Sequence, residues 1–427
     1  MRYVSTRGIA PAVDVDSALA AGLAPDGGLY IPETIPSVAS IDPSHGLART
    51  AASLHAPYFD DSRIADALPS ICDAAFDFPA PLRELDRNTF VLELFHGPTA
   101  AFKDFGARFL ARALGALRRP DDRETTILVA TSGDTGAAVA AAFHRRPGFR
   151  VVVLYPDGRV SPRQAHGLGC WGDNVRALRV DGTFDDCQRL VKQALTDTEL
   201  RAKAALGSAN SISLGRLLPQ AAYYAQASLE FQRDHGEPLN FVIPTGNLGN
   251  ATACWLARRM GLPIGDIVLA CNANDVLPRY FAGEDYAPAD TRATLANAMD
   301  VGAPSNFERL RAWHADDDEL RGAMRAVSVS DTTILTTIDA HHAQHGEPIC
   351  PHTATGFDVL AQLRRSGDAR PWAVVATAHP AKFEMVVEAR LGHTIEPPPA
   401  LAACLARPAT AEPIGASYRE LTDVLLG

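Results

Sequence analysis

The sequence predicts an α/β protein in which helices cover parallel β-sheets. From Val91 onward, strand-like apolar runs alternate with helical patterns, which is the order expected of βαβ units. The chain has 427 residues, of which 47% are hydrophobic and 21% charged, as in ordinary globular proteins. This length is enough for two or three domains with large cores.

The overall charge is acidic, with 40 Lys and Arg residues against 50 Asp and Glu, a net charge of -10 and no basic block. We therefore expect neither nucleic acid nor an anionic membrane as a partner. No apolar run has the length of a membrane span and no signal-peptide core follows the start, so a cytoplasmic location is expected. The seven cysteines, an odd number without CxxC spacing, predict small buried residues in place of a disulfide framework or a zinc site.

The N-terminal residues 1–85 are predicted to form a domain of their own. Residues 15–21 have the pattern of an amphipathic helix, and Pro25-Asp26-Gly27-Gly28 between apolar runs is a turn signal. Residues 79–89 are polar and contain two prolines, which indicates a boundary. We expect a smaller α/β domain at residues 86–215 and a larger one, with a C-terminal strap, at residues 216–427.

Lys103 has an unusual position for a lysine. A strand is predicted at residues 89–95 and an amphipathic helix follows, so Lys103 lies at a strand-to-helix turn, close to a helix N-terminus. The helix dipole disfavours a cation there, and a partly desolvated amine in a positive field has a lowered pKa, as a Schiff-base nucleophile requires. This stretch alone leaves open a solvated surface lysine.

The next segment alternates strands and helices, with strands expected at residues 125–130, 151–155 and 175–180 and helices at residues 137–144 and after Thr183. A glycine-bearing turn at residues 131–136 opens the first of these helices, where backbone can approach a ligand closely. Ser132 and Thr135 in this turn are either ligand contacts or helix N-caps, and for each residue alone capping is favoured.

The best candidate for a phosphate-binding loop is Pro244-Thr245-Gly246-Asn247-Leu248-Gly249-Asn250, between a strand at residues 239–243 and a helix at residues 251–260. Its glycines let the backbone curl, and the helix N-terminus supplies N–H donors and a positive dipole end. The loop lacks the motifs of P-loop NTPases and dinucleotide folds, so a nucleotide is not implied. A glycine-rich corner without a ligand is the alternative.

The remaining elements are a polar loop at residues 208–216 before a helix at 217–231, strands at 267–271 and 372–376, a short helix after residues 350–356, and a proline-rich strap before a helix at 418–426. His341 and His345 stand at i and i+4 on a helix capped by Ser330. Without a further ligand at motif distance, a solvated helical face is favoured over a zinc site. Thr377 ends a strand, at the edge where α/β sheets bind ligands.

One activated lysine, a phosphate loop without a nucleotide motif and strand-end hydroxyls together describe a pyridoxal-phosphate site. The motifs resemble those of threonine synthases, in the tryptophan-synthase-β-like group of pyridoxal-phosphate enzymes, and closely resemble the bacterial and fungal subtype. The matching stretches are residues 3–8, 22–30, 96–106, 130–136, 208–217, 244–250, 297–302 and 377–383.

The resemblance implies a fold-type-II pyridoxal-phosphate enzyme, with the cofactor between two parallel-sheet domains and an N-terminal extension. It implies that Lys103 holds the cofactor as a Schiff base and then moves protons, and that Thr377 meets the pyridine nitrogen. The residues implied for the cofactor phosphate are Gly246, Asn247, Leu248, Gly249 and Asn250.

The resemblance also implies the reaction, in which O-phospho-L-homoserine and water give L-threonine and phosphate by γ-elimination and β-addition, without a metal. Ser132, Asp134 and Thr135 are then expected to face the substrate. Arg216 is the leading candidate for the substrate phosphate, because a guanidinium binds phosphate oxygens bidentately, and a structural salt bridge is its alternative. We expect a monomer or a homodimer.

Two alternatives stay open, a related lyase and a non-catalytic binding or regulatory protein, although the intact lysine and phosphate loop argue against the second. A related pyridoxal-phosphate lyase, either a phospho-lyase or a deaminase on hydroxy or phosphorylated amino acids, would share several motifs. Phe102-Lys103-Asp104 and Asp134 differ, however, from the Ser-x-Lys and the asparagine usual in such deaminases. The family usually has an acidic residue where this chain has Cys350, and the effect on His352 or a nearby loop is open.

Overall fold

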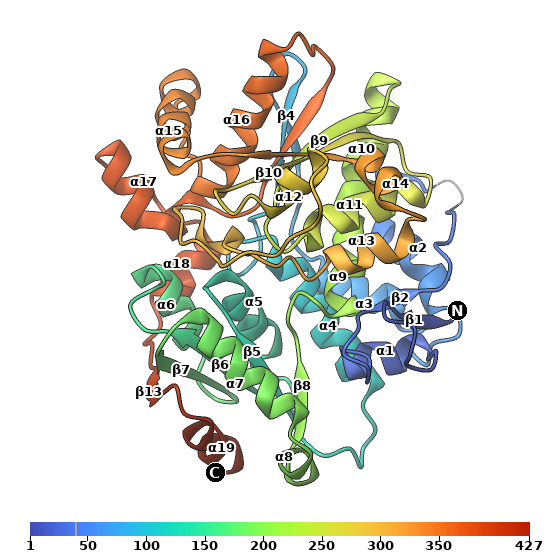
Figure 1. Ribbon diagram of the computed structural model, residues 1–427, viewed down its shortest axis with the longest axis vertical. Helices are drawn as coiled ribbons and strands as arrows, with labels where there is room; N and C mark the ends of the chain where they lie inside the picture. Colours follow the sequence, from blue (N-terminus) through green and yellow to red (C-terminus); the bar gives the residue numbers. More distant parts are fainter. Residues whose placement is uncertain (39–40) are drawn as a thin grey trace.

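The computed structural model describes residues 1–38 and 41–427, and two β-sheets flanked by helices form its core (Figure 1). The strands of the larger sheet are β3 (Leu82–Asp86), β4 (Thr89–Glu93), β9 (Leu239–Pro244), β10 (Ile264–Cys271), β11 (Arg325–Ser328) and β12 (Trp372–Ala376). Their order is β11-β10-β9-β12-β4-β3, and β3 runs antiparallel to β4 while the other neighbours are parallel.

The smaller sheet is parallel throughout its described strands, in the order β13-β7-β6-β5-β8. These strands are β5 (Thr125–Ala130), β6 (Phe149–Pro156), β7 (Val175–Asp181), β8 (Ala205–Ser208) and β13 (Glu412–Gly415). The predicted α/β class with two parallel sheets is therefore confirmed.

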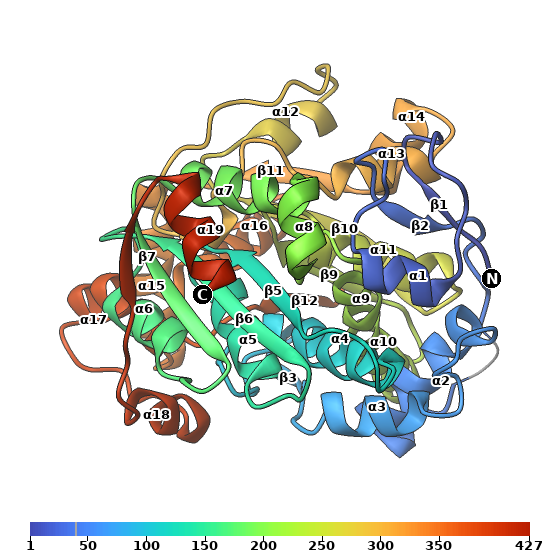
Figure 2. The same cartoon turned by 90° about the horizontal axis from the view of Figure 1, so that it is seen from below.

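Helices bury both faces of the smaller sheet. Those nearby are α5 (Asp134–Phe143), α6 (Pro162–Gly169), α7 (Phe184–Thr196), α8 (Thr198–Lys203) and α19 (Tyr418–Leu426). Ile127 and Val129 pack with α5 and α6, whereas Leu128 and Ala130 pack with α7 and α19, on the opposite side of the sheet (Figure 2). Since successive strand residues point to opposite faces, the run from Ile127 to Ala130 is apolar at each position and buries both faces of β5.

The larger sheet is also covered by helices on both faces, and further helices follow β8 in the chain before β13. They are α9 (Leu214–Leu217), η2 (Leu218–Gln220), α10 (Ala221–His235), α11 (Gly249–Arg259), α12 (Val276–Phe281), η3 (Asn297–Met299), α13 (Phe307–Trp313), α14 (Asp317–Ala323), α15 (Asp331–His345), α16 (Pro351–Arg365), η4 (Pro380–Phe383), α17 (Glu384–Leu391) and α18 (Pro399–Leu405). Phe241 and Ala373 belong to the core cluster with α10 and α11, and Val242 and Val374 to the cluster with α15 and α16.

The N-terminal region adds a two-stranded antiparallel sheet and several helices beside α4 (Lys103–Leu117). Its elements are β1 (Tyr3–Ser5), α1 (Val15–Ala21), β2 (Tyr30–Pro32), η1 (Pro43–His45), α2 (Leu47–Phe59) and α3 (Leu68–Ala75). The predicted helix at residues 15–21 is confirmed, with Asp14 as its N-cap.

Two sequence predictions were wrong in detail, and one strand was not predicted. That strand is β3, inside the predicted boundary at residues 79–89, and its residues are half-buried or exposed at a sheet edge and lack a clear apolar pattern. Residues 351–356 are the first turns of α16, with Cys350 as its N-cap, and do not precede a short helix. The strap contains α18 and β13, and the short edge strand β13 includes a proline, which weakens its strand signal.

The predicted solvated face of His341 and His345 is wrong for His341, which is 6% exposed and packs on the Phe357 ring at 4.4 Å. Burial lowers the pKa of His341 to about 4. Residues 1–38 and 41–427 contain no group of three or more side chains able to hold a metal ion. None of their helices combines the length and apolar character that a membrane span needs.

The predicted domain limits at residues 85 and 215 remain a prediction. Sheet membership crosses them, because β4 lies in the predicted smaller domain and pairs with β12 of the larger sheet. In the other direction, β13 lies in the predicted C-terminal strap and pairs with β7 of the smaller sheet. The chain therefore passes between the two sheets more than once.

Candidate active site

A cavity of about 590 Å³ lies at the carboxyl ends of strands from both sheets. Asp134 follows β5, Thr377 follows β12 and Pro244 ends β9. The complete lining is Phe102, Lys103, Asp134, Ser211, Arg216, Gln220, residues 244–250, Ala298, Met299, His352 and Thr377. This is the edge at which parallel α/β sheets place their ligands.

Lys103 is the first residue of α4, which confirms its predicted place at a helix start. Its side chain is half-buried, and the Nζ atom lies 4.5 Å from the centre of the Phe102 ring. Burial and the positive charge of Arg216 lower the pKa of Lys103 to about 8, although Asp134 acts in the opposite direction. The amine is therefore easier to deprotonate than that of an ordinary lysine.

The predicted phosphate loop leads into α11, which begins at Gly249. Leu248, the N-cap, has a left-handed backbone with φ 63°, and within the described chain no side chain caps the helix. Its first N–H groups are thus available to a ligand, beside the positive end of the helix dipole. A Cβ atom on Gly246 would lie 2.7 Å from the Met299 Cα, so glycine permits this close packing.

The two asparagines of the loop are held by other parts of the chain. Asn247 Nδ2 donates to Ser211 Oγ at 2.8 Å, and Asn247 Oδ1 accepts from the Ser305 N–H. Asn250 Oδ1 accepts from Tyr223 at 2.5 Å and from Tyr224 at 2.9 Å, while its Nδ2 has no partner among the described residues. These bonds hold the loop in place and leave Asn250 Nδ2 as a free donor.

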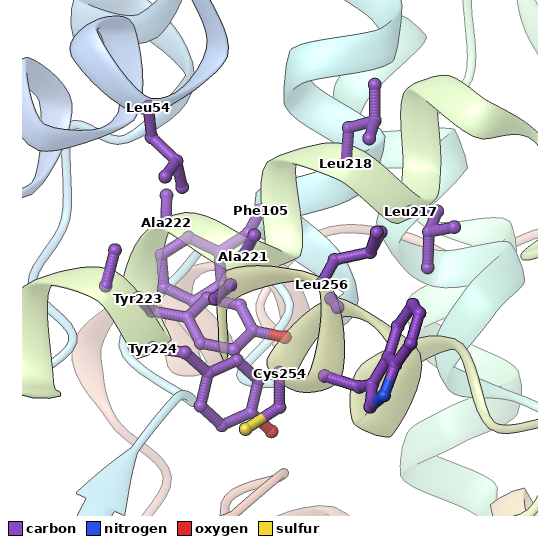
Figure 3. Close-up of a cluster of buried hydrophobic side chains, with 14 of the residues drawn as sticks. Leu54, Phe105, Leu217, Leu218, Ala221, Ala222, Tyr223, Tyr224, Cys254 and Leu256 are labelled. Carbon is purple, nitrogen blue, oxygen red and sulfur yellow. The ribbon is translucent and has the colours of Figure 1, made fainter. Parts of the chain in front are cut away.

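Tyr223 and Tyr224 belong to a packed core cluster (Figure 3), which also includes Leu248 of the phosphate loop. Their ring centres are 4.8 Å apart, and Phe105 of α4 lies 5.1 Å from the Tyr223 ring. This aromatic contact joins the helix that begins with Lys103 to the helix that supports Asn250. It thereby fixes the lysine end and the phosphate end of the cavity relative to each other.

Asp134 and Lys382 form a buried ion pair, with the Asp134 carboxylate 2.7 Å from Lys382 Nζ. Lys382 also donates to the Thr99 carbonyl at 2.7 Å, in the turn before Lys103. Burial disfavours the Asp134 carboxylate, but Lys382 outweighs this effect and holds the pKa of Asp134 below its usual value. The pair keeps a negative charge on the cavity wall.

Ser132 and Thr135, the two hydroxyl residues beside Asp134, do not have the N-cap role that the sequence predicted. Gly133 is the N-cap of α5 and makes no side-chain capping bond, so the N-cap interpretation of Ser132 and Thr135 is wrong. Thr131 Oγ1 instead accepts from the N–H groups of Gly133 and Gly136, at 3.0 and 2.9 Å. As far as the structure describes the chain, Asp134 lines the cavity and Ser132 and Thr135 do not.

Arg216 is 1% exposed and lines the cavity. Its Nη1 donates to the Ala209 carbonyl at 2.6 Å, and its buried Nε has no partner within residues 1–38 and 41–427. Burial lowers the pKa of Arg216 to about 10. Thr377 is 5% exposed, and its carbonyl accepts from the Phe102 N–H at 2.9 Å, which ties the end of β12 to the start of α4.

His352 and Lys382 are site residues that sequence reasoning missed. His352 Nε2 accepts from the Ala298 N–H at 3.1 Å, so the neutral ring carries its proton on Nδ1, which lacks a partner in the described chain. Burial lowers the pKa of His352 to about 4, so this neutral form dominates. Lys382 lies inside the matching stretch at residues 377–383 and His352 two residues after Cys350, but one sequence cannot show that these segments converge.

The structure also answers the question about Cys350. Its Sγ atom accepts from the Thr353 N–H at 3.4 Å and lies 3.2 Å from the Thr353 hydroxyl. The thiol thus caps α16, the role that an acidic or hydroxyl side chain has at most helix starts. The first turn of α16, which carries His352, is formed without the acidic residue.

The cavity fits pyridoxal phosphate. An amine with a lowered pKa stands at one end and an uncapped helix N-terminus at the other. Arg216 Nε, Asn250 Nδ2 and His352 Nδ1 are buried donors without a partner among the described residues. Because unpaired buried donors are costly, their concentration around one cavity indicates an anionic, hydrogen-bonding ligand.

Comparison with known proteins also indicates a pyridoxal-phosphate enzyme. The family model described as "Pyridoxal-phosphate dependent enzyme" matches residues 76–381. Models described as "Threonine synthase N terminus" and "Threonine synthase, C-terminal" match residues 2–76 and 353–424.

Similar proteins extend over nearly the whole chain. Threonine synthase from Haemophilus influenzae is 40% identical over 388 residues, which are 89% of each protein. The crystal structure of threonine synthase from Escherichia coli superposes with a TM-score of 0.89 at 36% identity and covers 100% of this chain and 99% of that one. The structure of threonine synthase with bound pyridoxal phosphate from Brucella melitensis has a TM-score of 0.91 at 34% identity, with the same coverage.

Proposed function

Because the chain belongs to the threonine synthase family of pyridoxal-phosphate-dependent enzymes, we propose that the residues around the described cavity carry out the reaction of this family. The function is that of a threonine synthase, with pyridoxal phosphate as cofactor. The reaction converts O-phospho-L-homoserine and water to L-threonine and phosphate. The observation that supports the proposed residues is the meeting of Lys103, an uncapped helix and unpartnered donors in one cavity.

Three groups of residues would hold the cofactor. Lys103 would bind its aldehyde covalently, Thr377 would contact the ring nitrogen, and the phosphate would be held by Gly246, Asn247, Leu248, Gly249 and Asn250. When bound, pyridoxal phosphate supplies an electron sink next to the reacting amino acid. A hydroxyl at the ring nitrogen, in place of a carboxylate, leaves that nitrogen less firmly protonated.

Lys103 Nζ is the base in this proposal. A pKa of about 8 leaves roughly one tenth of the amine neutral at pH 7, far more than for an ordinary lysine, so it can accept a proton and give it back. Each proton that leaves the substrate carbon skeleton would move to this nitrogen. Burial of the surrounding residues keeps bulk water from competing for the same protons.

Arg216 binds the substrate phosphate in this proposal, since its Nε donor is unused and lies in the cavity wall. Asp134 is held by Lys382 and contacts the amino-acid part of the substrate. Ser132 and Thr135 remain proposed substrate contacts, and they would have to approach the ligand from outside the lining of the described cavity. His352 Nδ1 offers one further donor.

We further propose that the protein works in the cytoplasm as a monomer or a homodimer, without a nucleic-acid partner. All seven cysteines are free thiols, as expected in a reducing compartment. The net charge of -10 argues against nucleic acid.

The decisive experiment is to incubate the purified protein and pyridoxal phosphate with O-phospho-L-homoserine and to quantify the products. Threonine and phosphate in equal amounts are expected. Accumulation of 2-oxobutyrate instead would indicate the related lyase. Lys103→Ala, checked for folding by circular dichroism, should lose both turnover and the visible absorbance of the bound cofactor, and retained turnover would overturn the role of Lys103.

A further inference from the structure

Two cysteines far apart in the sequence meet in the fold. Cys170 directly follows α6 and Cys404 lies in α18, and their sulfur atoms are 2.9 Å apart. Both residues are 4% exposed, and α6 and α18 are neighbours (Figure 1). This separation is shorter than the 4.0 Å between Cys170 Sγ and the Gly167 carbonyl oxygen. It is also shorter than the 3.3 Å between the Tyr58 hydroxyl and Met260 Sδ.

We propose that Cys170 and Cys404 form a redox-modification site, at which a peroxide joins the two sulfurs in a reversible disulfide. A disulfide has a sulfur–sulfur bond of about 2.05 Å, so closure requires a movement of less than ~1 Å. The sequence alone predicted no such pair, because neither cysteine has a partner at motif spacing.

Cys404 is the sulfur that reacts first, because it lines a small cavity whose described lining does not include Cys170. A hydrogen bond from Cys170 lowers the pKa of the Cys404 thiol, and Arg407 and Lys382 add positive charge. The same contact raises the pKa of Cys170, which therefore remains the protonated donor. Burial raises the pKa of Cys72, Cys187 and Cys271 to about 12, so these thiols are much less reactive.

Space for a small oxidant lies beside Cys404. Together with Asp134, Gln164 and Lys382, this cysteine lines a second cavity, which has room for about one water-sized molecule. Hydrogen peroxide is little larger than water and can reach this sulfur, whereas a protein oxidant cannot. The position explains how a buried thiol can still react.

The proposed reaction balances in two steps. The Cys404 thiolate attacks one oxygen of hydrogen peroxide, the O–O bond breaks, and the sulfur becomes a sulfenic acid while one water leaves. The Cys170 sulfur then attacks that sulfur, and a second water is released as the S–S bond forms. Two thiols lose two electrons and two protons, and the peroxide is reduced to water.

The disulfide would link α18 covalently to α6, and α6 already contacts residues at the active site. Gln164 of α6 donates to Asp134 at 3.4 Å, and its Oε1 accepts from Asn297 at 3.3 Å. The end of α6 is joined to the C-terminal strap by one backbone bond, from the Thr410 N–H to the Gly169 carbonyl at 3.0 Å. A covalent link here restrains the strap between α18 and β13, and it closes a long loop in the unfolded chain.

The test treats the holoenzyme with a small molar excess of hydrogen peroxide, blocks remaining thiols, and maps the peptides without reduction. We expect one cross-linked peptide pair containing Cys170 and Cys404, and loss of two of the seven titratable thiols. The unfolding temperature should rise by about 3 °C, because a long closed loop restrains the unfolded chain. Dithiothreitol should reverse both changes.

Three variants make the result specific. Cys404→Ser should abolish the reaction, and Cys170→Ser should stop it at a sulfenic acid on Cys404 that dimedone traps. Cys271→Ser, which removes another buried thiol, should still form the cross-link. Any of three outcomes would overturn the proposal. These are free Cys170 and Cys404 thiols after oxidation, a sulfenic acid that persists in the unmutated enzyme, and equal cross-linking of other cysteines.

Discussion

The carboxylate of Asp134 lies 2.7 Å from Lys382 Nζ, and the two side chains are 5% and 4% exposed. One residue begins α5 beside the smaller sheet, and the other lies in η4 after the last strand of the larger sheet. The pair thus joins two distant parts of the chain at the wall of the cavity that contains Lys103.

Lys382→Met should destabilise the protein strongly. The substitution keeps most of the side-chain volume but leaves the Asp134 carboxylate buried without its cation, which costs about 3–5 kcal/mol in the free energy of unfolding. Urea denaturation measures this loss. The double variant Lys382→Met with Asp134→Asn should recover much of it, since no unpaired charge then remains.

The matched control is Arg390→Met, which breaks the exposed ion pair with Asp339, whose side chains are 40% and 42% exposed. Little change in stability is expected there, because water solvates both charges. Equal effects of the two substitutions, or a double variant no more stable than Lys382→Met, would show that the buried pair has no special role.

The rate at which the apoprotein recovers its cofactor should depend on the protonation of Lys103. Only the neutral amine attacks an aldehyde, and its pKa is lowered to about 8. Below this pH the rate should rise about tenfold per pH unit, and above it the rate should level off. The visible absorbance of the Schiff base follows the reaction, and Lys103→Ala supplies the blank.

Arg216→Gln should move this midpoint upward, since the Arg216 charge is one cause of the lowered pKa. A rate that keeps rising toward pH 10 in the unmutated protein would mean that Lys103 behaves as an ordinary lysine.

Gly246→Ala should weaken cofactor binding. The added methyl group would meet the Met299 backbone at 2.7 Å, and the loop must shift to accept it. A cost of about 1–3 kcal/mol is expected, seen as a roughly 5- to 150-fold higher dissociation constant for pyridoxal phosphate. Gly322→Ala is the control, because its methyl group would meet nothing within 4 Å. Unchanged affinity in Gly246→Ala would place the phosphate elsewhere.

Loss of the Arg216 guanidinium should affect the phosphorylated substrate most. We expect Arg216→Gln to raise the KM for O-phospho-L-homoserine by about 10- to 100-fold, the value of one or two charge-assisted hydrogen bonds. Inhibition by inorganic phosphate should weaken in parallel. Arg419→Gln on the exposed face of α19 controls for net charge. If both inhibition and KM stay unchanged, Arg216 has a structural role only.

Local patterns were sufficient for most elements of the fold. The strands at residues 125–130 and 372–376 and the helix at residues 418–426 have the limits that the sequence predicted. The two strands contain continuous apolar runs and the helix has an amphipathic pattern, so in each case the signal lies within a few neighbouring positions. Edge strands such as β3 and β13 lack that pattern, because one side of each is not buried.

The sequence by itself determined the fold class, the lysine at a helix start, the glycine-rich loop and, through several motifs in order, the family. Only the tertiary structure decided which side chains share a cavity. Two contacts join segments more than 200 residues apart, the pairing of Asp134 with Lys382 and the contact of Cys170 with Cys404. The free donor on His352 depends on a backbone N–H group from another loop. Lys103, first recognised as a misplaced cation, has its lowered pKa because burial and Arg216 act on it together. Such effects depend on distance in space, and a chain sequence records only distance along the backbone.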